Sequence, residues 1–135
     1  RLPHEAEWEW AARWNSNEQQ ADSRYFPWKG SKEDDADFAQ HCNCSQTGLD
    51  HTSAVGLFPS GKADCGALDL AGNVWEWCEN WYDADQDERV LRGGSWGGGN
   101  PARLSCSCRS FVGPYNRCQI LGFRCVVVVG GSARR

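Results

Sequence analysis

The chain has 135 residues, a formal net charge of −4, eight Trp, fifteen Gly and no Met. Its bulky aromatic side chains supply enough apolar area for one modest core, which excludes a disordered chain. The longest apolar run, Val126 to Val129, is far too short for a membrane span, which excludes a membrane-spanning protein. We therefore expect one globular domain over residues 1–135.

Charge is unevenly distributed along the chain. Residues 1–88 contain all 18 acidic residues, whereas residues 89–135 contain eight Arg and no acidic residue. A basic half can indicate nucleic-acid binding. Because the whole chain is acidic and its basic half has no Lys cluster, we instead predict that the two halves lie against each other in one fold. No nucleic-acid partner is expected.

The first fifteen residues, RLPHEAEWEWAARWN, predict a helix. Pro3 suits a first helical turn because its fixed φ and missing N–H are compatible with that position. Trp10 and Trp14 are four residues apart, as are Trp8 and Ala12. This spacing predicts one broad aromatic face that packs into the core.

Residues 15–64 are polar and rich in turn formers, with little periodicity. A loop of this length within a compact domain is uncommon, and it is usually functional or held by irregular packing. We expect its apolar residues to hold it against the core. They are Trp28, Phe38, Leu49, Val55, Leu57 and Phe58.

The second half predicts short strands. Val74–Cys78 alternates as a strand after a turn at residues 71–73, and Arg89–Arg92 forms another that ends at Gly93 and Gly94. The run GFRCVVVV, residues 122–129, predicts a final strand buried on both faces. The sequence therefore predicts an α+β fold with few short strands, one or two helices and much ordered loop.

Eight Cys in a chain of this size allow a zinc site or a disulfide. The C-x-C pairs at Cys42 and Cys106 lack the C-x-x-C spacing that holds a tetrahedral ion well, so zinc is the weaker alternative. In an oxidising compartment we expect one disulfide. Its partners would come from Cys42, Cys44, Cys65 and Cys78, and the spacing does not fix the pairing.

Four segments resemble a known family in their order along the chain. RLPHEAEWEWAAR, DLAGNVWEWCENWY, RVLRGGSW and GFRCV are similar to the formylglycine-generating-enzyme-like (sulfatase-modifying-factor) domain. The resemblance implies this family's variant of the C-type lectin fold. The family's usual elements upstream of RLP are missing, so the domain resembles a trimmed or minimal version. His4 stands where the family usually has a Thr or Ser helix cap.

The resemblance does not imply the family's enzymatic activity. Its oxidising members place two cysteines, five residues apart, shortly after the GGSW turn, for copper-dependent oxidation of a peptidyl cysteine. The matching positions here are Gly98 and Arg103, neither of which offers a thiol or a copper ligand. We therefore expect no enzyme, with such an oxidase as the alternative. A carbohydrate-binding lectin is a third reading, but the Glu-Pro-Asn type of sugar motif is missing.

The same fold serves the variable proteins of diversity-generating retroelements, which this chain also resembles. In that group an error-prone reverse transcriptase rewrites adenines, largely in Asn codons, between GGSW and GFR. Randomising the first two bases of an AAC codon never yields Trp, Met, Lys, Glu or Gln. These types number 24 in residues 1–96, but only Gln119 belongs to them between Gly97 and Ile120. The resemblance implies a hypervariable region at about residues 97–120.

The resemblance implies three sets of positions whose side chains can be exchanged while the scaffold stays fixed, and these positions would form a ligand-binding surface. We name them the exchangeable positions. They are Gly97, Gly98, Gly99 and Asn100, then Cys108, Ser110, Phe111, Val112 and Gly113, then Tyr115, Cys118, Gln119 and Ile120. Phe111, Tyr115 and Ile120 would be apolar contacts for a ligand, with core packing as the alternative for the two aromatics. The residues between them would be scaffold, namely Pro101, Ala102, Arg103, Leu104, Arg109 and Arg117.

The ligand implied is a protein or a cell-surface molecule, and no cofactor is required. Family members bind calcium near the AGNVWEW turn, where the matching residues are Asp69, Gly72, Val74 and Glu76. The alternative is that the two carboxylates cap the turn and pair with Arg residues of the basic half. The sequence leaves the location open, with a cell surface or a virion as the expectation for a variable receptor.

Overall fold

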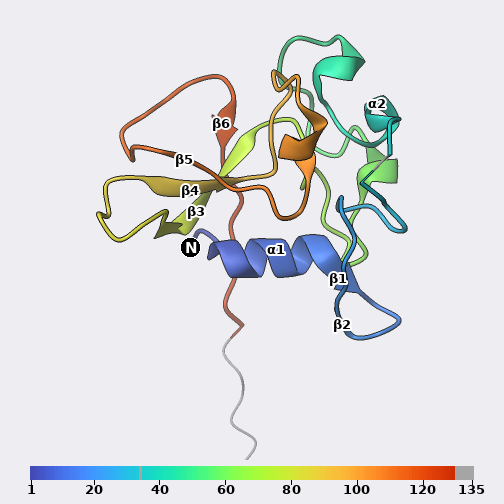
Figure 1. The fold of residues 1–135 in the computed structure, drawn as a ribbon, viewed down its shortest axis with the longest axis horizontal. Helices are drawn as coiled ribbons and strands as arrows, with labels where there is room; N and C mark the ends of the chain where they lie inside the picture. Colours follow the sequence, from blue (N-terminus) through green and yellow to red (C-terminus); the bar gives the residue numbers. More distant parts are fainter. Residues whose placement is uncertain (34, 130–135) are drawn as a thin grey trace, which may run out of the picture.

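The computed structural model describes residues 1–33 and 35–129 (Figure 1). Position 34 and residues 130–135, which the expected domain includes, lie outside the described residues. A curled sheet lies to one side, the long loops lie to the other, and α1 runs beneath both (Figure 1). Within the described residues, no helix combines the length and apolarity that crossing a membrane requires.

Helix α1 (Glu5–Arg13) begins where the sequence predicts. The His4 ring accepts a hydrogen bond from the Ala6 N–H, and the Glu7 carboxylate accepts one from the His4 N–H. This reciprocal arrangement is a capping box, so His4 performs the role that Ser or Thr usually has.

The predicted aromatic face of α1 is only partly correct. Trp8 and Ala12 are buried, but Trp10 is 52% exposed and packs on Trp14, with ring centroids 4.4 Å apart. The expectation that Trp10 faces the core is therefore wrong. Trp10 lies two positions after Trp8, about 200° around a helix with 3.6 residues per turn, so the two rings lie on opposite sides.

The long loop contains short elements and an aromatic cluster. Strands β1 (Trp14–Asn15) and β2 (Gln20–Ala21) form a small hairpin, followed by α2 (Phe38–His41) and the 3-10 turns η1 (Ser45–Thr47) and η2 (Pro59–Gly61).

Phe26 stacks on Trp28, with centroids 4.8 Å apart, and meets the edge of Phe38 at 5.0 Å. The expected packing of Trp28 and Phe38 is confirmed, and Phe58 is half-buried. Burial of Leu49, Val55 and Leu57 was a wrong expectation, because all three are exposed.

The sheet has the strand order β5–β4–β3–β6. Its members are β3 (Trp75–Trp81), β4 (Arg89–Arg92), β5 (Ser110–Val112) and β6 (Leu121–Gly122). Strand β4 is antiparallel to both of its neighbours, whereas β6 runs parallel to β3. Turn η3 (Pro101–Leu104) lies between β4 and β5 in the chain.

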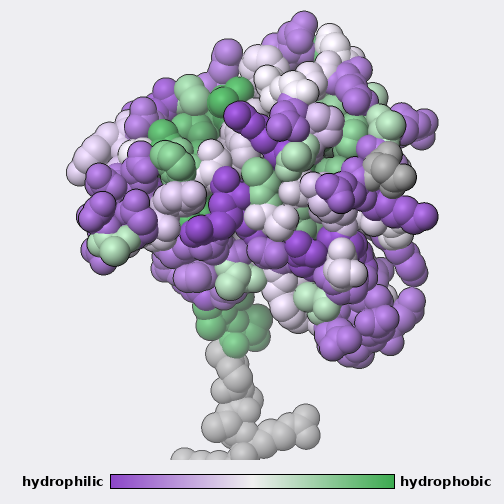
Figure 2. Space-filling model, viewed as in Figure 1, coloured by the Kyte–Doolittle hydropathy of each residue, from purple (hydrophilic) through white to green (hydrophobic). Residues whose placement is uncertain are grey.

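The predicted strand over residues 122–129 is wrong beyond Gly122. The Val126 N–H donates to the Arg1 carbonyl at 2.9 Å, and Val127, Val128 and Val129 are exposed. The chain has left the sheet here and continues below α1, where Figure 2 shows a hydrophobic stem. An apolar run alone does not distinguish a buried strand from an exposed extended segment.

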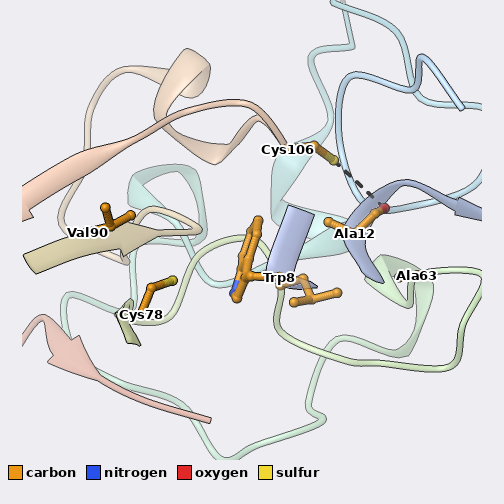
Figure 3. Close-up of a cluster of buried hydrophobic side chains, with 7 residues drawn as sticks. Trp8, Ala12, Ala63, Cys78, Val90 and Cys106 are labelled. Atoms are coloured by element: carbon orange, nitrogen blue, oxygen red, sulfur yellow. Dashed lines mark hydrogen bonds between the residues drawn. The ribbon is translucent and has the colours of Figure 1, made fainter. Parts of the chain in front are cut away.

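The main core joins α1, β3, β4 and the loops (Figure 3). Trp8 and Ala12 pack there with Cys78, Val90 and Cys106, whose thiol faces the Ala12 carbonyl. All eight cysteines are free, so the expected disulfide is wrong. Burial raises the pKa of the Cys78 and Cys106 thiols to about 12, so both act as small apolar side chains.

Ion pairs join the acidic and basic halves, as predicted from the charge distribution. Glu5 pairs with Arg109 and Glu76 with Arg124, each with a nitrogen–oxygen distance of 2.6 Å. Glu9 pairs with the buried Arg92. The arginines of the second half thus stabilise contacts between segments that are far apart in the sequence.

We expect stability to fall in acid through Asp22. Hydrogen bonds from Arg24 lower the pKa of Asp22 from 3.8 to about 2. A carboxyl with a depressed folded-state pKa stabilises the fold above its unfolded pKa and loses that contribution as pH falls toward 2. The free energy of unfolding should drop by on the order of 1 kcal/mol from this pair over that range.

Urea unfolding of the wild type and Asp22→Asn measures this contribution. The variant should be less stable at pH 6, and the difference should shrink at pH 2.5. A constant difference across this range would contradict the assignment to ionisation of Asp22.

Candidate ligand-binding surface

The GGSW turn, after β4, requires two glycines. Gly93 and Gly94 have φ values of +95° and +73°, in the left-handed region that side chains other than Gly rarely adopt. A Cβ at Gly94 would lie 2.9 Å from both the Arg103 carbonyl oxygen and a Leu104 methyl group. The turn is therefore packed against η3 and leaves no room for a side chain.

The three glycines that follow the GGSW turn are not required by the backbone conformation or by close packing. Gly97, Gly98 and Gly99 do not have positive φ. A Cβ at Gly97 would make an ordinary contact with Ile120 at 3.9 Å, one at Gly98 would lie 3.6 Å from a backbone oxygen, and one at Gly99 would meet nothing within 4 Å. The backbone accepts side chains at all three positions.

Arg92 holds the chain that follows the turn. Its side chain is 0% exposed and donates to the backbone carbonyls of Cys106, Ser107 and Cys108 at 2.8–3.0 Å. It also pairs with Glu9 and lies over the Trp8 ring. One guanidinium thus fixes three successive residues of the second half to β4 and α1.

None of the exchangeable positions is buried, as the burial pattern of residues 97–120 shows. Tyr115 is 94% exposed, and Phe111 is 46% exposed although its ring packs on Tyr82 at 4.4 Å. Neither aromatic belongs to the core, so the alternative reading of core packing does not apply to them.

A hollow of about 260 Å³ lies between β5 and the chain that returns to β6. We name it the β5–β6 hollow. Exchangeable Ser110, Phe111, Val112, Cys118 and Ile120 line it, together with Trp75, Leu91, Arg103, Asn116, Arg117 and Leu121. The second and third sets thus meet in this hollow, and a side chain at position 97 of the first set would reach Ile120 at its border.

Other exchangeable positions lie outside the lining of this hollow. They are Gly97, Gly98, Gly99, Asn100, Cys108, Gly113, Tyr115 and Gln119. Asn100 has a local structural role, because its side-chain oxygen accepts the Ala102 N–H at 3.0 Å and caps η3.

Two arginines that line this hollow were not among the site residues predicted from the sequence. Arg103 and Arg117 were assigned to the scaffold, yet both are exposed and line the β5–β6 hollow. Arg109, which received the same assignment, does have a scaffold role through Glu5. The total absence of acidic residues after residue 88 was the signal that could have identified these two cations.

The expected calcium ligands do not suit a cation in this arrangement. Both Glu76 oxygens accept from Arg124, at 2.6 and 2.7 Å, and one also accepts from the Trp8 indole. Asp69 accepts the Gly56 N–H at 2.7 Å. The Arg124 guanidinium already supplies the positive charge at Glu76, so this carboxylate pairs with arginine, whereas Asp69 holds a loop N–H; this set of contacts favours the alternative for Glu76 over a calcium ligand.

We expect Glu76→Gln to lower the free energy of unfolding by about 2 kcal/mol, because it leaves a largely buried Arg124 without its counter-charge. Thermal unfolding would measure the loss. Glu79→Gln is a matched control because Glu79 is half exposed and contacts Arg1 only at 3.3 Å. Equal Tm values for the two variants, or a Tm restored by added calcium, would contradict the structural role of the pair.

A curled sheet, a capped helix beneath it, long ordered loops and a glycine turn define a formylglycine-generating-enzyme-like domain of the C-type lectin type. The sulfatase-modifying factor enzyme 1-like domain matches residues 1–129, and the chain belongs to this family. The fold and family implied by the four sequence segments are thus confirmed.

Three relatives illustrate the range within the family. The chain is 37% identical over 144 residues to inactive C-alpha-formylglycine-generating enzyme 2 of Bos taurus, covering 96% of the chain and 44% of that protein. It is 36% identical over 141 residues to hercynine oxygenase of Mycobacterium tuberculosis, covering 92% and 31%. Treponema denticola variable protein 1 superposes with a TM-score of 0.74 at 30% identity, covering 91% and 45%.

The chain therefore spans less than half the length of these relatives. Their names include an inactive enzyme, an oxygenase and a variable protein. Membership of the family by itself does not decide between catalysis and binding, so the function has to be argued from the site.

Proposed function

We propose that this chain is a ligand-binding variable protein of a diversity-generating retroelement and has no catalytic activity. One observation carries the proposal: none of the exchangeable positions is buried, and members of the second and third sets line the β5–β6 hollow, where a side chain at position 97 of the first set would reach Ile120. The residues that hold this backbone, Gly93, Gly94 and Arg92, lie outside the exchangeable sets. Such a division allows the surface to change while the scaffold stays fixed.

The residues at and near the positions of the family's cysteine pair support binding over oxidation chemistry. Gly98 and Arg103 occupy the positions of the family's cysteine pair. Of the cysteines that follow the GGSW turn, Cys106 has a pKa raised to about 12 by burial, and burial also raises the pKa of Cys108. A protonated thiol is a poor nucleophile and a poor metal ligand.

The ligand class that suits such a surface is a protein or another cell-surface molecule. Exposed Phe111 and Tyr115 offer large contact areas with few rotatable bonds, as binding surfaces usually do. Display on a cell surface or a virion would give the surface access to such ligands.

A pair of libraries tests the proposal. The first randomises the exchangeable positions, and the second randomises framework positions such as Gly93, Gly94, Val90 and Leu104. We expect most members of the first library to remain folded on yeast display, with binders to a chosen protein recoverable from it. Few members of the second should fold. Equal loss of folding in the two libraries would contradict the proposal.

The source genome offers a separate test. The genome should contain a second, nearly identical copy of codons 97–120, which serves as the template. The two copies should differ only at positions where the template has adenine. A genome that encodes this chain but holds no such template would overturn the retroelement assignment.

A further inference from the structure

We propose that Arg103 and Arg117 form a fixed cationic pair in the β5–β6 hollow that binds a carboxylate of an acidic side chain on a protein partner. The apolar wall of the same hollow would hold a bulky side chain next to that carboxylate. This inference rests on the proposed function and names the chemistry of its partner.

The other arginines of the described second half already have partners. Arg92, Arg109 and Arg124 pair with glutamates. Arg89 donates to the Glu79 carbonyl and lies over the Trp81 ring, 3.5 Å from its centroid.

Arg103 and Arg117 differ from this group. Neither makes a side-chain hydrogen bond or ion pair with any residue in the ranges 1–33 and 35–129, and both are exposed. No acidic residue among those the structure describes lines the hollow, so its lining supplies no counter-charge of its own. A carboxylate from outside would supply it.

Local structure holds the backbone of both arginines. Arg103 lies in η3, where its N–H donates to the backbone carbonyl of Asn100 at 3.0 Å and the buried Leu104 follows it. Arg117 follows a turn closed by the Asn116 N–H and side-chain amide, which both donate to the Gly113 carbonyl, at 3.0 and 3.1 Å. A backbone that is already ordered lowers the entropy lost on binding.

Neither arginine is an exchangeable position. The cationic pair would therefore persist in every variant of the surface, while Ser110, Phe111, Val112, Cys118 and Ile120 change the shape and polarity around it. The anion contact would be constant and the apolar contact variable.

The size and lining of the hollow favour side chains of a macromolecule over a small free ligand. Its volume of about 260 Å³ is below the ~300–1,000 Å³ typical of small-molecule pockets. Trp75, Leu91 and Leu121 add apolar surface beside the cations. Figure 2 shows a hydrophobic area over the part of the surface where Figure 1 places β6 and the loop before it.

A carboxylate fits the cations better than a polyanion does. Guanidinium groups bind carboxylates through paired, charge-assisted hydrogen bonds. A nucleic acid would also meet the acidic remainder of a chain whose net charge is −4, which opposes its approach. A single acidic side chain beside an apolar one avoids this repulsion.

Titration of the whole chain with two short peptides tests the inference. The probes are acetyl-Phe-Glu-Phe-Glu-amide and its matched neutral analogue, acetyl-Phe-Gln-Phe-Gln-amide, followed by NMR of arginine Nε–Hε and Leu, Val and Ile methyl groups. We expect the acidic peptide to shift the signals of Arg103, Arg117 and Ile120. The double variant R103Q/R117Q should weaken its binding by on the order of tenfold, as expected for lost charge-assisted hydrogen bonds.

The double variant K29Q/K62Q is the matched control. It removes the same charge from exposed lysines that do not line the hollow, and we expect it to leave the affinity within about twofold, a long-range charge effect at physiological salt. Melting temperatures of both double variants equal to that of the wild type would establish that neither change unfolds the protein.

Several outcomes would overturn the inference. One is equal affinity for the acidic and neutral peptides, another is equal weakening in the two double variants, and a third is no shift in the hollow at millimolar acidic peptide. A single-stranded oligonucleotide that binds the hollow more tightly than the acidic peptide would assign the cations to nucleic acid instead. None of these results changes the outcome of the library test, so the proposed function is judged separately.

Discussion

Gly94→Ala is expected to lower the free energy of unfolding by about 3 kcal/mol, a large part of the 5–15 kcal/mol that stabilises a typical domain. Two effects add. The φ of +73° is unfavourable for a residue with a Cβ, and that Cβ would lie 2.9 Å from the Arg103 carbonyl and from Leu104. Urea unfolding followed by tryptophan fluorescence would measure the loss.

Gly99→Ala is the matched control for this prediction. Gly99 lies five residues further along, has no positive φ, and has no atom within 4 Å of an added Cβ. Its stability should stay within about 0.5 kcal/mol of the wild type, as at exposed sites generally. If Gly99→Ala destabilised the chain as much as Gly94→Ala, the glycine run would be framework, and the division into fixed and exchangeable positions would fail.

Arg92→Met is expected to lower the free energy of unfolding by about 4 kcal/mol, the range for removing one partner of a buried ion pair. The variant leaves the carbonyls of Cys106, Ser107 and Cys108 without their common donor and leaves Glu9 without its partner. Residues 106–108 would lose their attachment to β4. Hydrogen exchange at residues 106–108 should therefore increase together with the global loss of stability.

Two further variants make this prediction specific. Arg92→Lys keeps the charge but lacks the planar fork that reaches several acceptors, so it should restore little of the stability. Arg103→Met removes an exposed guanidinium from the hollow and should change stability by less than about 0.5 kcal/mol. A fully stable Arg92→Met variant would mean that apolar packing replaces the buried network.

Elements with a local cause were predicted correctly from the sequence. Helix α1 begins after His4 because the capping interactions involve residues within one turn. Strand β4 has the predicted bounds, Arg89–Arg92, because Gly93 and Gly94 end it. In each case the determining contacts lie within a few residues of one another.

Elements that depend on distant packing were predicted less well. Trp10 and Val127 are as apolar as core residues, yet both are exposed, because no other described segment covers them. The number of cysteines likewise suggested a disulfide for an oxidising compartment, whereas Cys42, Cys44 and Cys78 are buried as free thiols. Composition records that a side chain is apolar, but burial depends on which other segment lies against it.

The sequence by itself determined the family, the framework segments and the limits of the region expected to vary, because these are written in short motifs and in the types of residue used. Only the tertiary structure decided that β5 and the chain before β6 enclose one hollow, and that a side chain at position 97 would reach Ile120. It also decided that Glu76 binds Arg124, while Arg103 and Arg117 face the hollow. Such pairings depend on distances between residues far apart in the chain, which residue order alone does not specify.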